Sequence, residues 1–336
     1  MSVLNITNGD GAAQLLQASS VDGDILPWRD PMHHGPFPAG LGLPELSVIR
    51  ADYLSGPDDD PSAARQGFQQ RDDQLRDANR YDEVVLWFEH DLLDQLQILQ
   101  LLDWFLGVDF DRTKLAFICI DRFDGVPDFR GLGNLTPEQV ATLWDVRRPV
   151  TRDQLDLARA GWHAFRAPDP RNLQRLLTRD LTALPFLGRA LRRHLQDYPW
   201  LKDGLTRTER QILGLVADGT SAPGRIFVEN MNREDVLFMG DWSTFRHIDL
   251  LCRAKTPLLH CRPGPEFQCP PPMTITREEF LAQRLMPSEN GRRVLAGEAN
   301  ARGMIERDIW LGGVHLVSGA PLWMWDDDND RLELIP

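Results

Sequence analysis

The sequence predicts an α/β protein with a Rossmann-like parallel sheet in its N-terminal domain, a helical middle segment and a C-terminal winged-helix-like α+β domain. Short apolar segments alternate with helical patterns over residues 1–125. Two of these segments are apolar throughout, as expected when helices cover both faces of a parallel sheet. In the last third, several predicted helices precede a terminal hairpin. We therefore expect an α/β ligand-binding domain at 1–135, a helical region at 136–203 and a winged-helix-like domain at 204–336.

The N-terminal elements follow in a regular order. A short strand at 3–6 leads through the turn NGDG into a helix at 12–18, and a second strand covers 24–28. Proline and glycine make 29–43 a loop, and helices fit 43–54 and 64–79. The segments EVVLWF at 83–88 and LAFICI at 115–120 are the apolar strands, and a long helix to about residue 106 follows the first.

The C-terminal elements are predicted mainly from helix start signals. Four Thr-x-x-Glu/Gln sequences fit the capping box, and they begin at Thr136, Thr151, Thr206 and Thr276. Further helices fit 173–182, 186–196, 242–252 with Asp241 as the cap, and 291–299. Apolar runs at 309–317 and 322–325 and a strand at 332–335 complete the hairpin region.

Charge is distributed unevenly along the chain. Residues 1–150 contain 25 acidic and 12 basic side chains, which gives 12 − 25 = −13, whereas residues 151–336 contain 25 of each. Because phosphate contacts need clustered Lys and Arg, nucleic-acid binding by residues 1–150 is disfavoured. The arginine-rich stretch from Arg147 to Arg193 fits either a solvated helical face or an anion site. The predicted recognition helix carries Arg246 and Arg253 against Asp241 and Asp249, a neutral balance, so an intramolecular or protein-interaction role is favoured over DNA binding.

We expect a cytoplasmic protein. No apolar stretch reaches the roughly 20 residues of a membrane span, and the first residues lack the pattern of a secretion signal. The four cysteines lack the spacing of a zinc site and are expected to be reduced. No motif identifies a cofactor or a metal ion.

Polar side chains follow the predicted strands at their carboxyl ends. In a parallel sheet these ends lie at one edge, where ligands bind. Glu89, His90, Asp10 and Asp30 are the candidate catalytic residues, because neighbouring carboxyl and imidazole groups shift each other's pKa and can transfer protons. The candidate ligand-binding residues at the same rim are Asn8, Gly9, Gly11, Trp28, Arg29, His34, Asp91, Gln95, Asp121 and Arg122.

Several of these residues also fit structural roles. Asp91 precedes a helix and is favoured as an N-cap. Asp10 fits a turn or cap equally well, and Asp121 with Arg122 fits a salt-bridged turn. His34 lies in a loop, where exposed histidines usually have no catalytic role. Cys119 lies in an apolar strand and is expected to be structural.

Several runs resemble a bacterial family, the domain of unknown function 1835 family, whose longer members carry a second C-terminal domain of unknown function. The runs are NITNGDGAAQLL, DILPWRDPMHHGP, WFEHDLLDQLQILQLLDWF, LTRTERQIL, GRRVLAGEAN and IWLGGVHL. The resemblance implies no activity, but it draws attention to Gly9, Asp10, Asp30, Gly35, Pro36 and the segment 89–95. Gly11 replaces a frequent serine, and residues 304–308 depart from an expected Asn-Gly before Ile-Asp.

The sequence thus predicts a protein that binds a small polar or phosphorylated molecule at the rim, with hydrolysis or group transfer as the reaction if it is an enzyme. His90 and Glu89 would act as acid and base, and Asp10 or Asp30 would orient the ligand. The alternative is a regulatory or adaptor protein with a ligand-sensing α/β domain and a winged-helix-like interaction module that contacts a protein or DNA. A protein partner or homo-oligomer is favoured over DNA. A metal-dependent version would use His34, His90 and nearby carboxylates.

Overall fold

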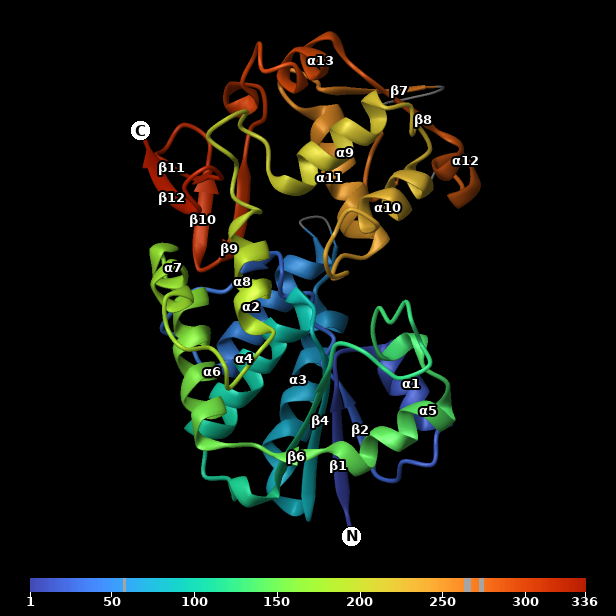
Figure 1. Ribbon diagram of the computed structural model, residues 1–336, viewed down its shortest axis with the longest axis vertical. Helices are drawn as coiled ribbons and strands as arrows, with labels where there is room; N and C mark the ends of the chain where they lie inside the picture. The colour runs from blue at the N-terminus through green and yellow to red at the C-terminus, as the bar shows by residue number, and fades with distance from the viewer. Residues whose placement is uncertain (57–58, 263–266, 272–274) are drawn as a thin grey trace. The chain divides into compact units, whose positions relative to one another are not determined.

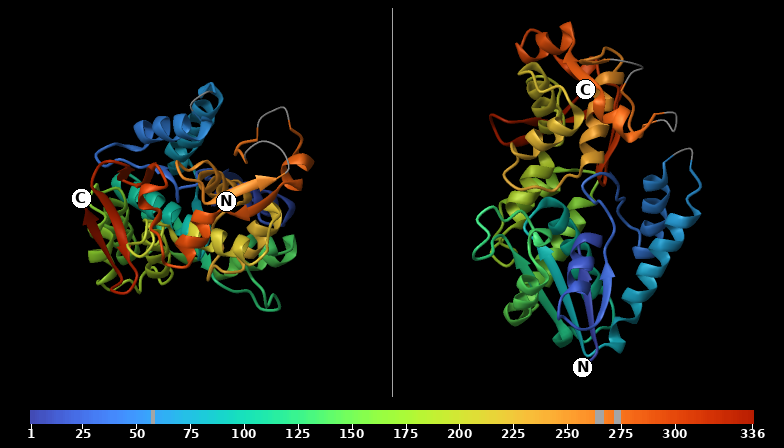
Figure 2. Two further views of the ribbon diagram at one scale, coloured as in Figure 1. Left: turned by 90° about the horizontal axis from the view of Figure 1, so that it is seen from above. Right: turned by 90° about the vertical axis from the view of Figure 1, so that its right-hand side faces the viewer.

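The computed structural model describes residues 1–56, 59–262, 267–271 and 275–336 (Figures 1 and 2). They form two compact units. Unit 1 comprises Met1–Arg192 and Trp310–His315, and unit 2 comprises Arg193–Ile309 and Leu316–Pro336. The expected helical region 136–203 is therefore divided between the units, and a short C-terminal segment belongs to unit 1.

Unit 1 is built on a five-stranded, mostly parallel sheet with the order β2-β1-β4-β5-β6. Its strands are β1 (Val3–Thr7), β2 (Asp24–Pro27), β4 (Glu83–Glu89), β5 (Leu115–Ile120) and β6 (Arg148–Pro149). β1 pairs in parallel with both β2 and β4, β4 pairs in parallel with β5, and only β6 runs antiparallel. The predicted mixed α/β architecture with a parallel sheet is confirmed.

Helices lie on both sides of this sheet (Figure 1). On one side are α1 (Asp10–Ala18) and α5 (Pro137–Thr142), which form a common core with Val3, Val85 and Trp87 of the strands. On the other side are α4 (Leu92–Gly107) and α6 (Arg152–Phe165). Burial of both faces explains why β4 and β5 are apolar at almost every position.

The remaining helices of unit 1 surround this core. They are α2 (Leu43–Ser55), α3 (Ser62–Arg76), α7 (Arg171–Leu177) and the first part of α8 (Leu187–Leu195). In the part of the chain that the structure describes, no helix has the length and apolarity needed to cross a membrane.

A C-terminal segment completes unit 1. β3 (Gly35–Pro36) pairs in parallel with Leu311 and Gly312 of β9 (Asp308–Gly312), and the amide of Gly313 donates to the carbonyl of Phe165. A Cβ atom at position 313 would lie 1.8 Å from the carbonyl oxygen of Arg166, so the close approach requires glycine. Sequence order alone does not reveal this return of the chain.

Unit 2 has its core among α9 (Arg207–Ala217), α10 (Pro223–Met231), α11 (Asp241–Arg253) and the antiparallel pair β7 (Leu259–Arg262) and β8 (Arg284–Pro287). Also present are α12 (Arg277–Ala282), α13 (Glu289–Leu295) and the hairpin of β11 (Leu322–Asp326) and β12 (Arg331–Ile335). β10 (Val314–Val317) is divided between the units, because unit 2 resumes at Leu316. The core side chains include Ile212, Leu213, Ile248, Leu251, Phe267 and Phe280.

The capping-box signals in the sequence are confirmed. All four capping boxes are formed, at Thr136, Thr151, Thr206 and Thr276. The cap predicted at Asp241 is wrong, because α11 begins at that residue and Gly240 is the N-cap. The four cysteines, all within the described residues, are free thiols.

Candidate functional site

Three buried carboxyl groups lie where β4 ends and α4 begins. Glu89 is the last residue of β4, Asp91 is the N-cap of α4, and Asp94 lies in the first turn of that helix. Their exposed fractions are 6%, 7% and 0%. Together with Asn8, which follows β1, they form what we call the carboxyl cluster.

Hydrogen bonds hold the carboxyl cluster together. The side-chain amide of Asn8 donates to Glu89 Oε1 at 3.3 Å and to Asp94 Oδ1 at 3.0 Å. Asp94 Oδ2 accepts from the Glu89 amide at 2.6 Å, and Asp91 Oδ1 accepts from the Asp94 amide at 2.8 Å. The bond from the Asp94 amide to Asp91 Oδ1 confirms the interpretation of Asp91 as an N-cap.

The loop before α5 covers Glu89. The amide of Leu132 donates to Glu89 Oε1 at 2.5 Å. Gly131 has a φ of +152°, and a Cβ atom there would lie 2.0 Å from the Glu89 carboxylate. Only glycine therefore allows the loop to approach the acid this closely.

No Lys, Arg or His side chain among the described residues bonds to these three acids. Burial, with the Asp91 charge adding to it, raises the pKa of Glu89 to about 8. Burial also raises the pKa of Asp91 to about 7, and burial with the charges of Asp91 and Glu89 raises that of Asp94 well above its ordinary value. The cluster therefore retains protons near neutral pH, which is the property that a general acid or base requires.

Gln95 and Cys119 both bond to the backbone of Glu89, at the end of β4. Gln95 Nε2 donates to the carbonyl oxygen of Glu89 at 2.8 Å and lies 3.6 Å from the Cys119 sulfur, and the Cys119 thiol donates to the same carbonyl at 3.2 Å. Burial raises the pKa of the Cys119 thiol well above its ordinary value, which makes it a poor nucleophile. Both side chains thus fix the end of β4.

His90 lies beside the cluster in a different environment. Its ring packs near Phe129 and Phe186, with centroid separations of 6.3 and 6.0 Å. Burial and the Arg189 guanidinium lower the pKa of His90, so the ring is neutral at pH 7. Its buried Nδ1 atom has no hydrogen-bond partner within the described residues, and no hydrogen bond joins it to Glu89.

Asp30 belongs to a second buried group. Arg50 donates to Asp30 Oδ1 at 2.7 Å and to the carbonyl of His34 at 2.8 Å. Both side chains of the ion pair are 1% exposed. The second carboxylate oxygen of Asp30 has no partner among the described residues. The His34 ring packs edge-on against that of His33.

Gln97 connects the two groups through the backbone. Its side-chain amide donates to the carbonyl oxygens of Asn8, Trp28 and Asp30 at 3.2, 2.8 and 3.0 Å. This side chain therefore fixes the ends of β1 and β2 relative to α4. Neither Gln97 nor Arg50 was predicted as a site residue.

Other predicted residues lie apart from the carboxyl cluster. Asp10 and Arg29 form an exposed ion pair at 2.7 Å. Trp28 is fully buried, donates to Gln100, and is covered by the guanidinium of Arg71 at 3.8 Å from the ring centroid. Its ring has no free face for a planar ligand.

The remaining predicted residues lie at or near the protein surface. Asp121 and Arg122 pair with each other at 3.0 Å, and the Arg122 side chain is 83% exposed. Gly9 and Gly11 have no atom within 4 Å of an added Cβ, which leaves space around the start of α1.

Asp94 is the cluster residue that sequence reasoning missed. Its signal was present, because an aspartate interrupts an apolar helix three residues after an N-cap. The hydrogen bond from the Leu132 backbone amide to Glu89 could not be predicted, because a backbone amide is the same whatever the side chain. The metal-dependent arrangement is not formed: the described residues contain no group of three or more His, Cys, Asp or Glu side chains arranged to hold a metal ion.

Comparisons with known proteins add no family assignment. No protein-family model matches the chain, and the search of curated proteins finds no significant match. The resemblance noted from the sequence therefore stays a prediction.

Proposed function

We propose that unit 1 binds a small polar molecule at the carboxyl cluster and that Glu89 exchanges a proton with it. The observation that carries this proposal is the burial of three acids in one hydrogen-bonded group without a cation bonded to them. Such an arrangement is costly to keep, and strongly shifted acids concentrate at functional sites.

The position of the cluster supports the same function. In the sheet, β2 lies on one side of β1 and β4 lies on the other, so the connections diverge between β1 and β4. In Rossmann-like sheets, ligands bind outside the carboxyl ends of the strands at this point. Asn8 follows β1 and Glu89 ends β4, so the cluster occupies this position.

The electrostatics favour a neutral or cationic polar ligand over a phosphorylated one. The cluster offers carboxyl oxygens and no bonded cation that would neutralise a phosphate, whereas an amine, amide or hydroxyl would give these oxygens hydrogen-bond donors. If the protein is an enzyme, hydrolysis or group transfer fits, with protonated Glu89 donating to a leaving group and His90 Nδ1 available as a neutral acceptor.

Native mass spectrometry of protein purified gently from its host tests the proposal. We expect a retained small molecule that is lost in Asp94→Asn and Glu89→Gln but kept in Glu45→Gln, a control at an exposed position on α2. In thermal-shift measurements, the identified molecule should stabilise the wild type and Glu45→Gln but not Asp94→Asn or Glu89→Gln. Retention of the molecule by both cluster variants, with unchanged shifts, would contradict the proposal.

A second function is favoured for unit 2, an interaction module of the winged-helix type. The helices α9, α10 and α11 precede β7 and β8, and the Leu285 amide donates to the Ser221 carbonyl at 2.8 Å, which adds a third strand-like segment. Trp242 on α11 is 51% exposed. Arg253 lies 3.6 Å from Asp249, which reduces the positive charge of the helix and favours a protein partner over DNA.

Fluorescence anisotropy with labelled duplex DNA at low salt separates the two partners. We expect no saturable binding. Salt-sensitive binding that weakens in Arg246→Gln would assign the module to DNA instead.

A further inference from the structure

The helices α6 and α7 concentrate positive charge in a unit that is otherwise acidic. Residues 151–179 contain six arginines and three aspartates, whereas residues 1–150 contain more acids than bases. Three of the six arginines have carboxylate partners: Arg152 pairs with Asp156, Arg159 with Asp103 and Arg171 with Asp169.

The other three arginines have no carboxylate partner among the described residues. Arg166 donates to the carbonyl oxygens of Pro38 and Leu41, which holds its guanidinium in place beside Trp162. Arg175 bonds to the side-chain oxygen of Asn172, and Arg179 follows two residues after the end of α7. Guanidinium groups that form no ion pair keep their N–H donors for an anion.

Two adjoining cavities lie along this face. The first, of about 440 Å³, lies between α4, α6 and the segment that leads into α2, and its lining includes Trp104, Trp162 and Leu43. The second, of about 290 Å³, lies between α6 and α7 and is lined by Asn172, Arg175 and Arg179 among others. His163 lines both cavities, so they adjoin at this side chain.

The two cavities differ in chemistry. Among the described residues, no carboxylate lines the second cavity, which offers two guanidinium groups, an imidazole and an amide. Guanidinium groups suit the oxygens of a phosphate. The first cavity has indole and aliphatic walls, with Asp103 and Arg159 paired at its edge. Such walls suit an aromatic ring with polar edge groups.

We propose that the double cavity binds an aromatic phosphate ester of the mononucleotide class, with the ring in the first cavity and the phosphate in the second. Pockets for small ligands usually measure about 300–1,000 Å³, and the double cavity falls in this range. The site shares no residue with the carboxyl cluster and does not depend on the function proposed there.

Isothermal titration of the full chain with AMP, at roughly 50 mM salt, tests the proposal. We expect saturable binding that the double variant Arg175→Gln, Arg179→Gln weakens at least about tenfold, because it removes both guanidinium groups from the phosphate. Arg171→Gln is the control: it removes one positive charge from α7, the helix that carries Arg175, but Arg171 is paired with Asp169 and does not line the cavity. It should leave the affinity within about twofold.

Two further measurements test the assignment of each part. Trp104→Leu should weaken AMP binding about threefold to tenfold but leave the binding of inorganic phosphate unchanged, and adenosine should bind more weakly than AMP. Absence of AMP saturation at millimolar concentration would overturn the proposal. An equal loss in Arg171→Gln would show binding to general surface charge, and phosphate binding as tight as AMP binding would contradict the ring site.

Discussion

Each unit contains a buried polar cluster, and the two clusters treat their charges in opposite ways. In unit 1, three carboxyl groups are buried together, and the Asn8 amide is the side-chain partner of two of them, Glu89 and Asp94. In unit 2, every buried acid of the comparable cluster has an arginine. Glu209, which is 1% exposed, accepts two hydrogen bonds from Arg307 at 2.8 and 2.7 Å.

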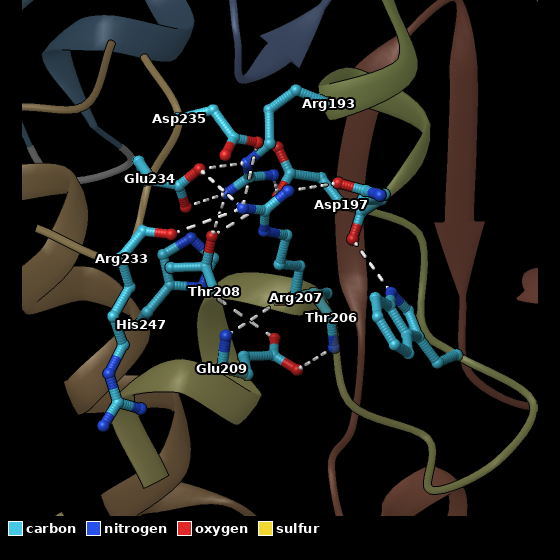
Figure 3. A network of polar contacts seen from close by, with 12 residues as sticks. Arg193, Asp197, Thr206, Arg207, Thr208, Glu209, Arg233, Glu234, Asp235 and His247 are labelled. Atoms are coloured by element: carbon cyan, nitrogen blue, oxygen red, sulfur yellow. Dashed lines mark hydrogen bonds and ion pairs between the residues drawn. The ribbon is translucent and has the colours of Figure 1, made fainter. Parts of the chain in front are cut away.

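The unit 2 cluster extends around Arg193 (Figure 3). Its guanidinium donates to Asp197 at 2.8 Å, to Glu234 at 2.7 Å and to Thr208 Oγ1 at 2.7 Å. Glu209 also completes the capping box of α9 by accepting from the Thr206 amide, as Figure 3 shows. Together these contacts tie α8, α9 and the segment after α10 to one another.

The two arrangements shift proton affinity in opposite directions. The Arg307 guanidinium holds the pKa of Glu209 far below its ordinary value despite the opposing effect of burial. In unit 1, burial raises the pKa of Glu89 because no cation opposes it. Removing the cation from a paired buried acid is strongly destabilising, whereas a cluster of buried acids without a cation already carries that cost and is kept where protons or ligands are exchanged.

The largest effect is expected when the cation that pairs with Glu209 in unit 2 is removed. Arg307→Met should lower the free energy of unfolding by about 3–5 kcal/mol, because Glu209 is then buried without its cation. Part of this loss should be recovered on lowering the pH, since Glu209 would become an acid whose folded-state pKa is raised. Urea unfolding at pH 5 and pH 8 measures both effects.

The double variant Arg307→Met, Glu209→Gln is the control for this experiment. It removes both charges and should be more stable at pH 8 than the single variant. Equal stability of the two variants would show that the ion pair is not what the arginine contributes.

In unit 1, replacing a buried acid that has no cation by its neutral amide should stabilise the protein. The folded-state pKa of Glu89, about 8, lies above its ordinary value of 4.5, so between these pH values folded Glu89 keeps a proton that the unfolded chain releases. Stability is therefore lost as the pH rises through this window. Glu89→Gln, which mimics the protonated acid, should raise the free energy of unfolding at pH 9 by about 2–3 kcal/mol.

Urea unfolding at pH 5 and pH 9 checks this prediction. The gain should be small at pH 5, where the wild-type acid is protonated in the folded protein. The exposed control Glu45→Gln should show no comparable gain at either pH. A loss of stability at pH 9 in Glu89→Gln would mean that the cluster is compensated by contacts other than those described.

The contrast also explains how much could be predicted from the sequence. The strands at 83–88 and 115–120 were predictable because complete burial makes them apolar, and the capping boxes were predictable because their signal is local. The rim position of Asn8 and Glu89 followed from the order of the elements.

The partners of these residues could not be predicted in the same way. The Leu132 amide reaches Glu89 through a loop, and a backbone group leaves no trace in residue type. Arg50 neutralises Asp30 from the middle of α2, and Arg307 neutralises Glu209 across 98 positions of sequence. Whether a buried acid is compensated is decided by such tertiary contacts.

The smallest predicted effect concerns an acid that is neither buried nor uncompensated. Asp10 and Arg29 are 2.7 Å apart, but their side chains are 56% and 63% exposed, so water screens the pair. Asp10→Asn should change the free energy of unfolding by about 0.5 kcal/mol or less and leave its pH dependence between pH 5 and pH 9 unaltered. The urea series used for Glu89→Gln measures this at the same rim, with a charge change of the same size. A pH-dependent gain in Asp10→Asn as large as that in Glu89→Gln would show that total negative charge, and not burial without a cation, sets the behaviour of the carboxyl cluster.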